Sequence, residues 1–139
     1  MLAVRLDGAR GDVTDTEWVV WTRHRSTPYV LSPLLYRGAL YFLRHYQSIL
    51  SRVDSSTGED RPGEIRLSGI RNVYASPVAA AGRVYITDQN GTTLVLSDGD
   101  PPETLALNRL DDRFSASAAV AGRELFLRGE RYLYSLGES

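Results

Sequence analysis

One phrase recurs along this chain at nearly constant spacing. Its three copies, the last of them weakened, are Ser32–Tyr41, Ser76–Tyr85 and Ala116–Phe126. The glycines that anchor them are Gly38, Gly82 and Gly122, so the period is 44 and then 40 residues. A repeat of this length constrains the fold strongly, because each repeat forms one supersecondary unit that buries its apolar face against the next unit.

Short strand signals fill each repeat. Apolar segments of about four to eight residues, rich in Val, Leu, Ile and Tyr, are bounded by Gly, Asp, Asn and Pro, which is typical of strands joined by tight turns. A repeat of about 40 to 45 residues built from four such strands is typical of a β-propeller blade. The predicted fold is therefore all-β, a propeller fragment of about three four-stranded antiparallel blades.

The strand signals divide the chain into one propeller-repeat unit with four parts. We expect blades over 32–70 and 76–110, and an incomplete blade of three strands over 116–137. Residues 1–24 hold two more strand signals, Leu2–Leu6 and Trp18–Arg23, which match the third and fourth strands of a partial blade. Because the chain begins within a strand, we expect it to be an excerpt of a longer chain.

Turn residues follow the predicted strands. Asn90-Gly91 is the strongest hairpin signal and predicts a type I′ turn, which needs a positive φ at both residues. Asp54, Asp88 and Asp98 each follow a strand and precede a glycine turn. We interpret these carboxylates as acceptors of local backbone hydrogen bonds rather than as catalytic acids or bases.

Composition excludes several classes of function. The net charge is −1, so the chain lacks the excess of positive charge that is typical of nucleic-acid-binding domains. The absence of cysteine excludes disulfides and thiolate metal sites. No apolar run approaches the roughly 20 residues of a membrane span, and the first residues lack the apolar region of a signal peptide. We therefore expect neither a nucleic-acid nor a membrane partner, and the compartment stays open.

The candidate binding residues lie in the loops that join a fourth strand to the next innermost strand. Each loop pairs an arginine with an aromatic residue: Arg25 with Tyr29, Arg71 with Tyr74, and Arg113 with Phe114. Around a ring, these pairs would form a positive, aromatic-edged channel mouth suited to anionic groups. In the alternative, the aromatic rings pack between blades and the arginines are solvated.

No catalytic or metal-binding residues are assigned. The sequence has no phosphate loop, nucleophile elbow or zinc motif. Its two histidines, His24 and His45, have no further ligands at a metal-binding spacing.

Two segments extend the repeat pattern further. Val53-Asp54-Ser55-Ser56-Thr57-Gly58 is similar to a Leu-Asp-x-x-Thr-Gly turn, and Asn90–Leu96 is similar to an Asp-Gly-x-Leu-x-Ala-Leu hairpin. With the Ser-Pro phrase, they make residues 18–137 resemble the C-terminal blades of pyrroloquinoline-quinone-type β-propellers. The quinone dehydrogenases of that family hold their cofactor with an adjacent cysteine pair, a stacking tryptophan and a calcium ion. This sequence has no cysteine and places Trp18 and Trp21 on outer strands, so we expect no cofactor.

The predicted function is a non-enzymatic propeller scaffold that binds a protein or a small anionic or aromatic ligand at the channel mouth. The alternative is a set of blades from a quinoprotein-like oxidoreductase whose catalytic residues lie elsewhere. Three blades do not close a ring, since propellers typically have about four to eight. We therefore expect copies to exchange the strand at Glu17–Arg23, as a six-bladed homodimer or, as second choice, a nine-bladed homotrimer. The plain alternative to exchange is a truncated propeller.

Overall fold

The computed structural model describes residues 1–44, 48–61 and 64–137. These residues form strands, turns and loops without a helix, and their strands build four antiparallel sheets of two to four strands. The all-β propeller-fragment prediction is confirmed. Closure of a ring by other copies is not shown.

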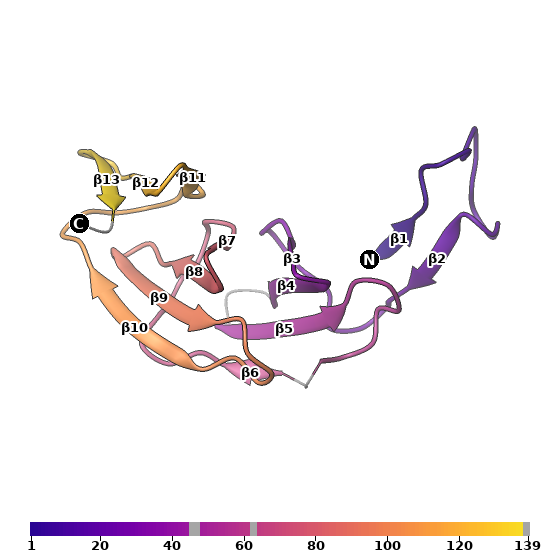
Figure 1. Cartoon of the computed structure of the whole chain (residues 1–139), viewed down its shortest axis with the longest axis horizontal. Helices are drawn as coiled ribbons and strands as arrows, with labels where there is room; N and C mark the ends of the chain where they lie inside the picture. Colours follow the sequence, from indigo (N-terminus) through magenta and orange to yellow (C-terminus); the bar gives the residue numbers. More distant parts are fainter. Residues whose placement is uncertain (45–47, 62–63, 138–139) are drawn as a thin grey trace.

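The sheets follow one another along the chain (Figure 1). The N-terminal half-blade consists of β1 (Leu2–Val4) and β2 (Val19–Thr22). Blade 1 consists of β3 (Leu34–Tyr36), β4 (Ala39–Arg44), β5 (Ile49–Asp54) and β6 (Ile65–Arg66). Blade 2 consists of β7 (Val78–Ala80), β8 (Arg83–Thr87), β9 (Thr92–Ser97) and β10 (Thr104–Arg109). Blade 3 consists of β11 (Ala119–Ala121), β12 (Glu124–Arg128) and β13 (Leu133–Gly137).

The predicted strands are present, with ends that differ by one or two residues. The fourth strand of blade 1 has only two residues, because Ile65 and Arg66 pair with Leu50 and Ile49, after which the chain turns away. The type I′ prediction at Asn90-Gly91 is wrong. The loop between β8 and β9 has four residues, and Gly91 has a positive φ of 90° while Asn90 does not, which suits a longer hairpin loop with glycine at its left-handed position.

The blades stand side by side in an arc, with β3, β7 and β11 along its inner edge (Figure 1). A chain of serine hydrogen bonds joins these inner strands at the start of each repeat. The backbone N–H of Ser32 donates to Oγ of Ser76 at 3.0 Å, and the N–H of Ser76 donates to Oγ of Ser117 at 2.9 Å. The recurring serine of the repeat therefore connects each blade to the next.

The apolar core lies between blades 1 and 2. Alternate residues of a strand face opposite sides of its sheet, so Val84 and Ile86 of β8 point towards blade 1 together with Leu94 of β9. Tyr41 and Leu50 meet them from blade 1. Each fully buried side chain of this kind stabilises the fold by about 1.5–3 kcal/mol, so this interface is a main source of stability.

A buried arginine closes the same interface beside the turn between β9 and β10. The side chain of Arg52 is 6% exposed, lies over the Tyr41 ring and donates to the Gly99 carbonyl and to Asp100 Oδ1, both at 3.1 Å. Nearby, Arg37 of blade 1 pairs with Asp98 of blade 2 at 2.7 Å. The acidic turn before β10 is thereby tied to the preceding blade.

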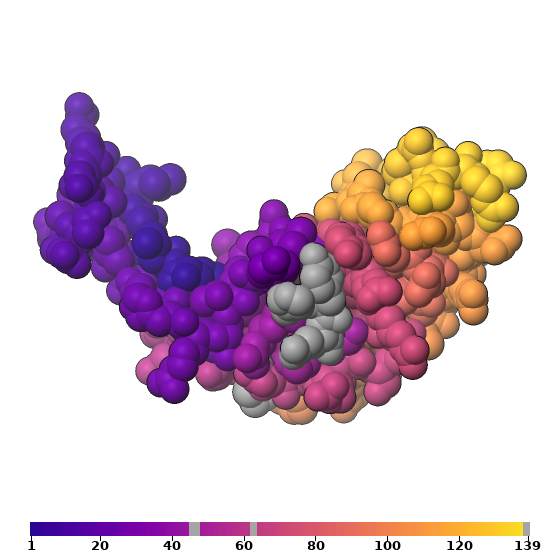
Figure 2. Space-filling model, turned by 180° about the vertical axis from the view of Figure 1, so that it is seen from behind, coloured from indigo at the N-terminus to yellow at the C-terminus, as the bar shows by residue number. Residues whose placement is uncertain are grey.

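The N-terminal half-blade projects from one end of the arc (Figure 2). Trp21 of β2 packs on Gly58 of blade 1, where a Cβ would lie 2.7 Å from its ring, and its Nε1–H donates to the Ser55 carbonyl at 3.0 Å. On its edge, β2 pairs with β1 through three residue pairs. The strand that we expect copies to exchange therefore has a partner strand within its own chain.

The serine chain generates the first prediction. Replacing Ser76 by alanine removes the acceptor for the Ser32 N–H, so we expect a loss of about 1 kcal/mol in the free energy of unfolding and a fall of about 4 °C in Tm. Thermal and urea unfolding measure both. Ser68→Ala, in an exposed loop, is the matched control and should stay within about 0.5 kcal/mol of the wild type. Equal losses in the two variants would contradict the role of the serine chain.

Candidate functional site

The candidate site is a cleft of about 720 Å³ between blades 2 and 3. It lies at the end of the blades formed by the loops that follow β6 and β10 and by the hairpin turns β8–β9 and β12–β13, which we call the loop face. Four arginines line it, Arg71, Arg109, Arg113 and Arg131, together with Asp88, Asp111, Asp112 and Glu130. The cleft therefore combines equal numbers of positive and negative side chains, and its chemistry depends on which of them are paired.

Asp88 joins the blade 2 hairpin to the loop from blade 1. It is 2% exposed and directly follows β8. Its Oδ1 accepts the N–H groups of Asn90 and Thr92, both at 2.9 Å, and its Oδ2 accepts the N–H of Arg71 at 3.1 Å. The interpretation of Asp88 as a backbone acceptor in a turn is thus supported by its contacts, and the same contacts place Arg71 in the cleft.

Asp112 is the corresponding carboxylate beside the blade 3 hairpin, but it belongs to the linking loop and not to the hairpin. The position after β12 that corresponds to Asp88 is Gly129, and a Cβ there would overlap Oδ2 of Asp112. The Asp112 carboxylate, on the loop after β10, accepts the N–H groups of Arg113, Arg131 and Tyr132 at 2.8–3.3 Å. A carboxylate thus occupies the same place beside both hairpins but comes from the hairpin in blade 2 and from the linking loop in blade 3.

Two pKa values are perturbed around this carboxylate. Burial by itself would raise the pKa of Asp112, but the N–H groups of Arg113, Arg131 and Tyr132 together outweigh it and lower the pKa below the usual 3.8. The Tyr134 hydroxyl donates to Asp112 Oδ2 at 3.2 Å, and burial followed by the charge of Asp112 raises the pKa of Tyr134 above 10.0. At neutral pH, Asp112 is therefore ionised and Tyr134 is neutral.

The arginines of the cleft differ in their partners. Arg131 pairs with Asp111 at 3.2 Å and with Asp112 at 3.7 Å, while Arg113 approaches Glu130 at 3.8 Å. Arg71 and Arg109 have exposed side chains and no ion pair within the part of the chain that the structure describes. The carboxylates of Asp88 and Asp112 accept backbone N–H groups, and neither forms an ion pair with Arg71 or Arg109 among the described residues.

The structure brings together part of the predicted channel mouth. Arg71 and Arg113 line the cleft. Phe114 is 1% exposed and packs on Tyr134 with ring centroids 5.7 Å apart, so its ring belongs to the interface between blades 2 and 3. Tyr74, Tyr29 and Arg25 are exposed and do not line the cleft.

Sequence reasoning missed Arg109 and Arg131. Arg109 ends β10 and Arg131 lies in the β12–β13 hairpin. The predicted loops were those between blades, whereas hairpin turns within blades reach the same face. Counting hairpin turns would have found Arg131, whereas Arg109 is the last residue of the strand before a predicted loop.

Neither histidine adds to the site. His24 is exposed, and His45 lies outside the described residues. Within the described residues, no group of three or more His, Cys, Asp and Glu side chains is arranged to hold a metal ion. The described residues form no helix long and apolar enough to span a membrane.

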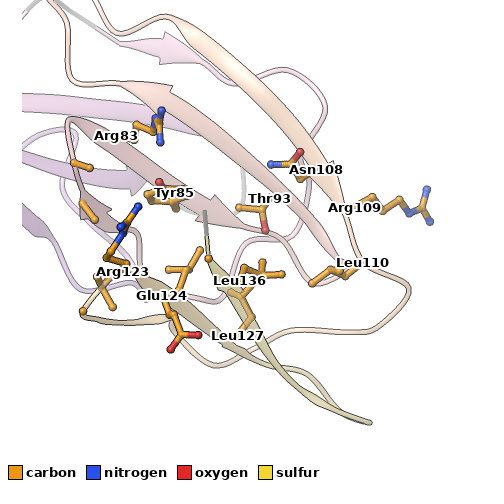
Figure 3. Close-up of a pocket in the computed structure, with 16 residues that line it drawn as sticks. Arg83, Tyr85, Thr93, Asn108, Arg109, Leu110, Arg123, Glu124, Leu127 and Leu136 are labelled. Atoms are coloured by element: carbon orange, nitrogen blue, oxygen red, sulfur yellow. The ribbon is translucent and has the colours of Figure 1, made fainter. Parts of the chain in front are cut away.

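A second cavity, of about 530 Å³, opens between the sheets of blades 2 and 3 (Figure 3). Arg83, Tyr85 and Thr93 line it from blade 2, and Leu127 and Leu136 line it from blade 3. The corresponding space between blades 1 and 2 holds the apolar core and Arg52. Blade 3 therefore packs less fully on blade 2 than blade 2 does on blade 1.

Comparison with known proteins supports the architecture. No protein-family model and no curated protein matches the sequence. Among solved structures, the chain is similar to BamB from Moraxella catarrhalis, a β-propeller protein, with a TM-score of 0.67 and 13% sequence identity. The match covers 88% of this chain and 37% of BamB. At this identity the likeness concerns the fold, and this chain spans little more than a third of the BamB propeller protein.

The equivalent places of the Asp88 and Asp112 carboxylates predict how Gly129 variants change the free energy of unfolding. Gly129→Asp places two carboxylates in one buried space, so we expect a loss of at least 2 kcal/mol in unfolding free energy, since unpaired buried charge is costly. Adding Asp112→Ala removes the overlap and restores the arrangement of blade 2, so the double variant should recover part of the loss. Chemical denaturation measures both. A double variant no more stable than Gly129→Asp alone would contradict the equivalence of the two positions.

The lowered pKa of Asp112 predicts an acid dependence of stability. A carboxyl whose folded pKa lies below its unfolded value stabilises the fold above the usual 3.8 and loses that contribution as pH falls through the folded pKa. Unfolding free energies measured between about pH 6 and pH 2 should therefore fall less steeply in Asp112→Asn than in the wild type. Parallel curves for the two proteins would show that Asp112 gains nothing from its N–H donors.

Proposed function

We propose that this chain is a set of β-propeller blades that acts as a non-enzymatic scaffold and binds an anionic oxygen group at the loop-face cleft. The group is a carboxylate or a phosphate, carried by a protein partner or a small molecule. Arginine suits such groups because its planar guanidinium donates two parallel hydrogen bonds to two oxygens.

The pairing of charges in the cleft carries this proposal. Arg71 and Arg109 have no ion pair among the described residues, and both line one cavity. The buried carboxylates near them, Asp88 and Asp112, already accept backbone N–H groups. An incoming anion therefore finds two arginines whose charge no carboxylate has neutralised.

The non-enzymatic part of the proposal follows from the same contacts. A general acid or base must be free to exchange a proton with a substrate. Asp88 and Asp112 are instead held by N–H donors, and the low pKa of Asp112 keeps it ionised at neutral pH. Both act as structural supports for the arginine-bearing loops.

The scaffold proposal includes assembly with further copies of the chain. Three blades cover an arc, while propellers of about four to eight blades close into rings. Two copies would give a six-bladed ring and three would give nine blades. A closed ring would place the clefts of all copies around one channel.

Titration with inorganic phosphate or sulfate tests the binding site. Each charge-assisted hydrogen bond is worth about 1.5–3 kcal/mol, so Arg71→Ala and Arg109→Ala should each weaken binding by about tenfold or more. Calorimetry at low salt measures the affinity, and circular dichroism checks that both variants fold. Arg25→Ala is the matched control, because Arg25 is exposed but lies outside the cleft.

An equal loss of affinity in Arg25→Ala would mean that anions bind through general charge rather than at the cleft. Unchanged affinity in both cleft variants would overturn the proposed site.

A further inference from the structure

Blade 3 presents an open edge beside the second cavity. In the described residues, β13 pairs with β12 on one side and with no strand on the other. Leu136 of β13 is 42% exposed and faces the 530 Å³ space against blade 2, where Tyr85 and Thr93 lie opposite (Figure 3). Backbone N–H and C=O groups on such an edge are ready to pair with a further strand.

Blade 2 shows what a fourth strand does in this fold. Its fourth strand, β10, runs antiparallel on β9, with Leu107 opposite Leu94, and Leu107 packs against Gly69 on the side of blade 1. The fourth strand thus covers the outer part of the space between two blades. An equivalent strand on β13 would begin beside Gly137, because β10 begins beside the last residues of β9, and would cover the second cavity.

Strand β2 has the two faces that this position requires. The face that carries Trp21 packs on blade 1 of its own chain, through contacts with Gly58 and Ser55. The opposite face carries Val20, which is 45% exposed. In the chain, β2 leads into β3 in the same way that β10 leads into β11, so it has the connection of a fourth strand.

Register places apolar side chains together. If Val19 lies beside Gly137, the antiparallel order puts Val20 beside Leu136 and Thr22 beside Tyr134. Leu136 corresponds to Leu96 of blade 2, since both pair with the same position of the preceding strand, and both face the previous blade. Val20 would therefore enter the cavity from its open side.

Charge supports the same placement. The segment before β2 carries Asp12, Asp15 and Glu17. With β2 on β13, this segment would lie near the β11–β12 turn, where Arg123 and, from blade 2, Arg83 line the cavity. The chain already uses this pattern once, because the acidic turn before β10 pairs Asp98 with Arg37 and Asp100 with Arg52 of the preceding blade.

From these observations we infer that β2 of one copy forms the fourth strand of blade 3 in a second copy. In a chain without such a partner, β1 occupies the edge of β2. The β1 strand holds the edge of β2 through three residue pairs, whereas β13 offers five residues. Displacing β1 lets β13 of the partner copy take that edge. This inference rests on the proposed assembly of copies and names the strands that form the contact.

Site-specific cross-linking tests the placement, because the chain has no cysteine of its own. Chains carrying Val20→Cys are mixed with chains carrying Leu136→Cys and oxidised gently. We expect a disulfide-linked pair at least tenfold above the yield from Leu6→Cys mixed with Leu136→Cys. Leu6 is more exposed than Val20 but lies outside β1 and β2, so it controls for random collisions.

Light scattering on the unmodified chain separates this inference from the proposed assembly. A particle of twice the 15.4 kDa chain mass is the expected result, and deletion of residues 1–5 should raise the fraction of chains in that particle, because the edge of β2 is then open. A particle of that mass without the Val20–Leu136 cross-link overturns the strand placement and leaves assembly standing. A particle of one chain mass at all concentrations overturns both, and neither result bears on anion binding at the cleft.

Discussion

Burial of one blade face by the next blade is the interaction on which this structure depends. A four-stranded sheet of this size has two apolar faces, and neither is covered within the blade itself. One face of blade 2 is covered by blade 1, where Ile86 and Leu94 meet Tyr41 and Leu50 in an apolar core. On its other side the packing against blade 3 leaves a cavity. Stability in this chain is therefore greatest at the middle of the arc.

Polar contacts between blades fix the spacing that the apolar core requires. At the inner edge this is the chain of serine bonds through Ser76, and at the loop face it is a buried carboxylate beside each of the last two hairpins. The carboxylate comes from Asp88 in one blade and from Asp112 in the next. The carboxylate has the same place in both blades although it comes from different segments, and in each blade it accepts backbone N–H groups. Leaving those N–H groups buried and unpaired would destabilise the fold. The same carboxylates hold the loops that carry the cleft arginines.

The positions of the cleft arginines at the loop face thus depend on the carboxylates that hold their loops. Arg71 lies on a loop fixed by Asp88, and Arg113 lies next to Asp112. The ring of arginine and aromatic pairs expected from the repeats is only partly realised, because Phe114 turns inward to pack on Tyr134. An aromatic side chain beside an unfilled blade interface gains more free energy by burial than by remaining at a solvent-exposed mouth. Repeated residues consequently take different roles in successive blades.

The strands, their order and the blade repeat were determined by the sequence alone, because period-two apolar patterns and glycine turns act over a few residues. Ser32, Ser76 and Ser117 also recur visibly, although their hydrogen bonds do not show in the sequence. The tertiary structure decided which face of each strand is covered and which arginines meet in one cleft. These features depend on contacts between residues distant in the chain, and such contacts are set by how neighbouring blades pack rather than by any local pattern.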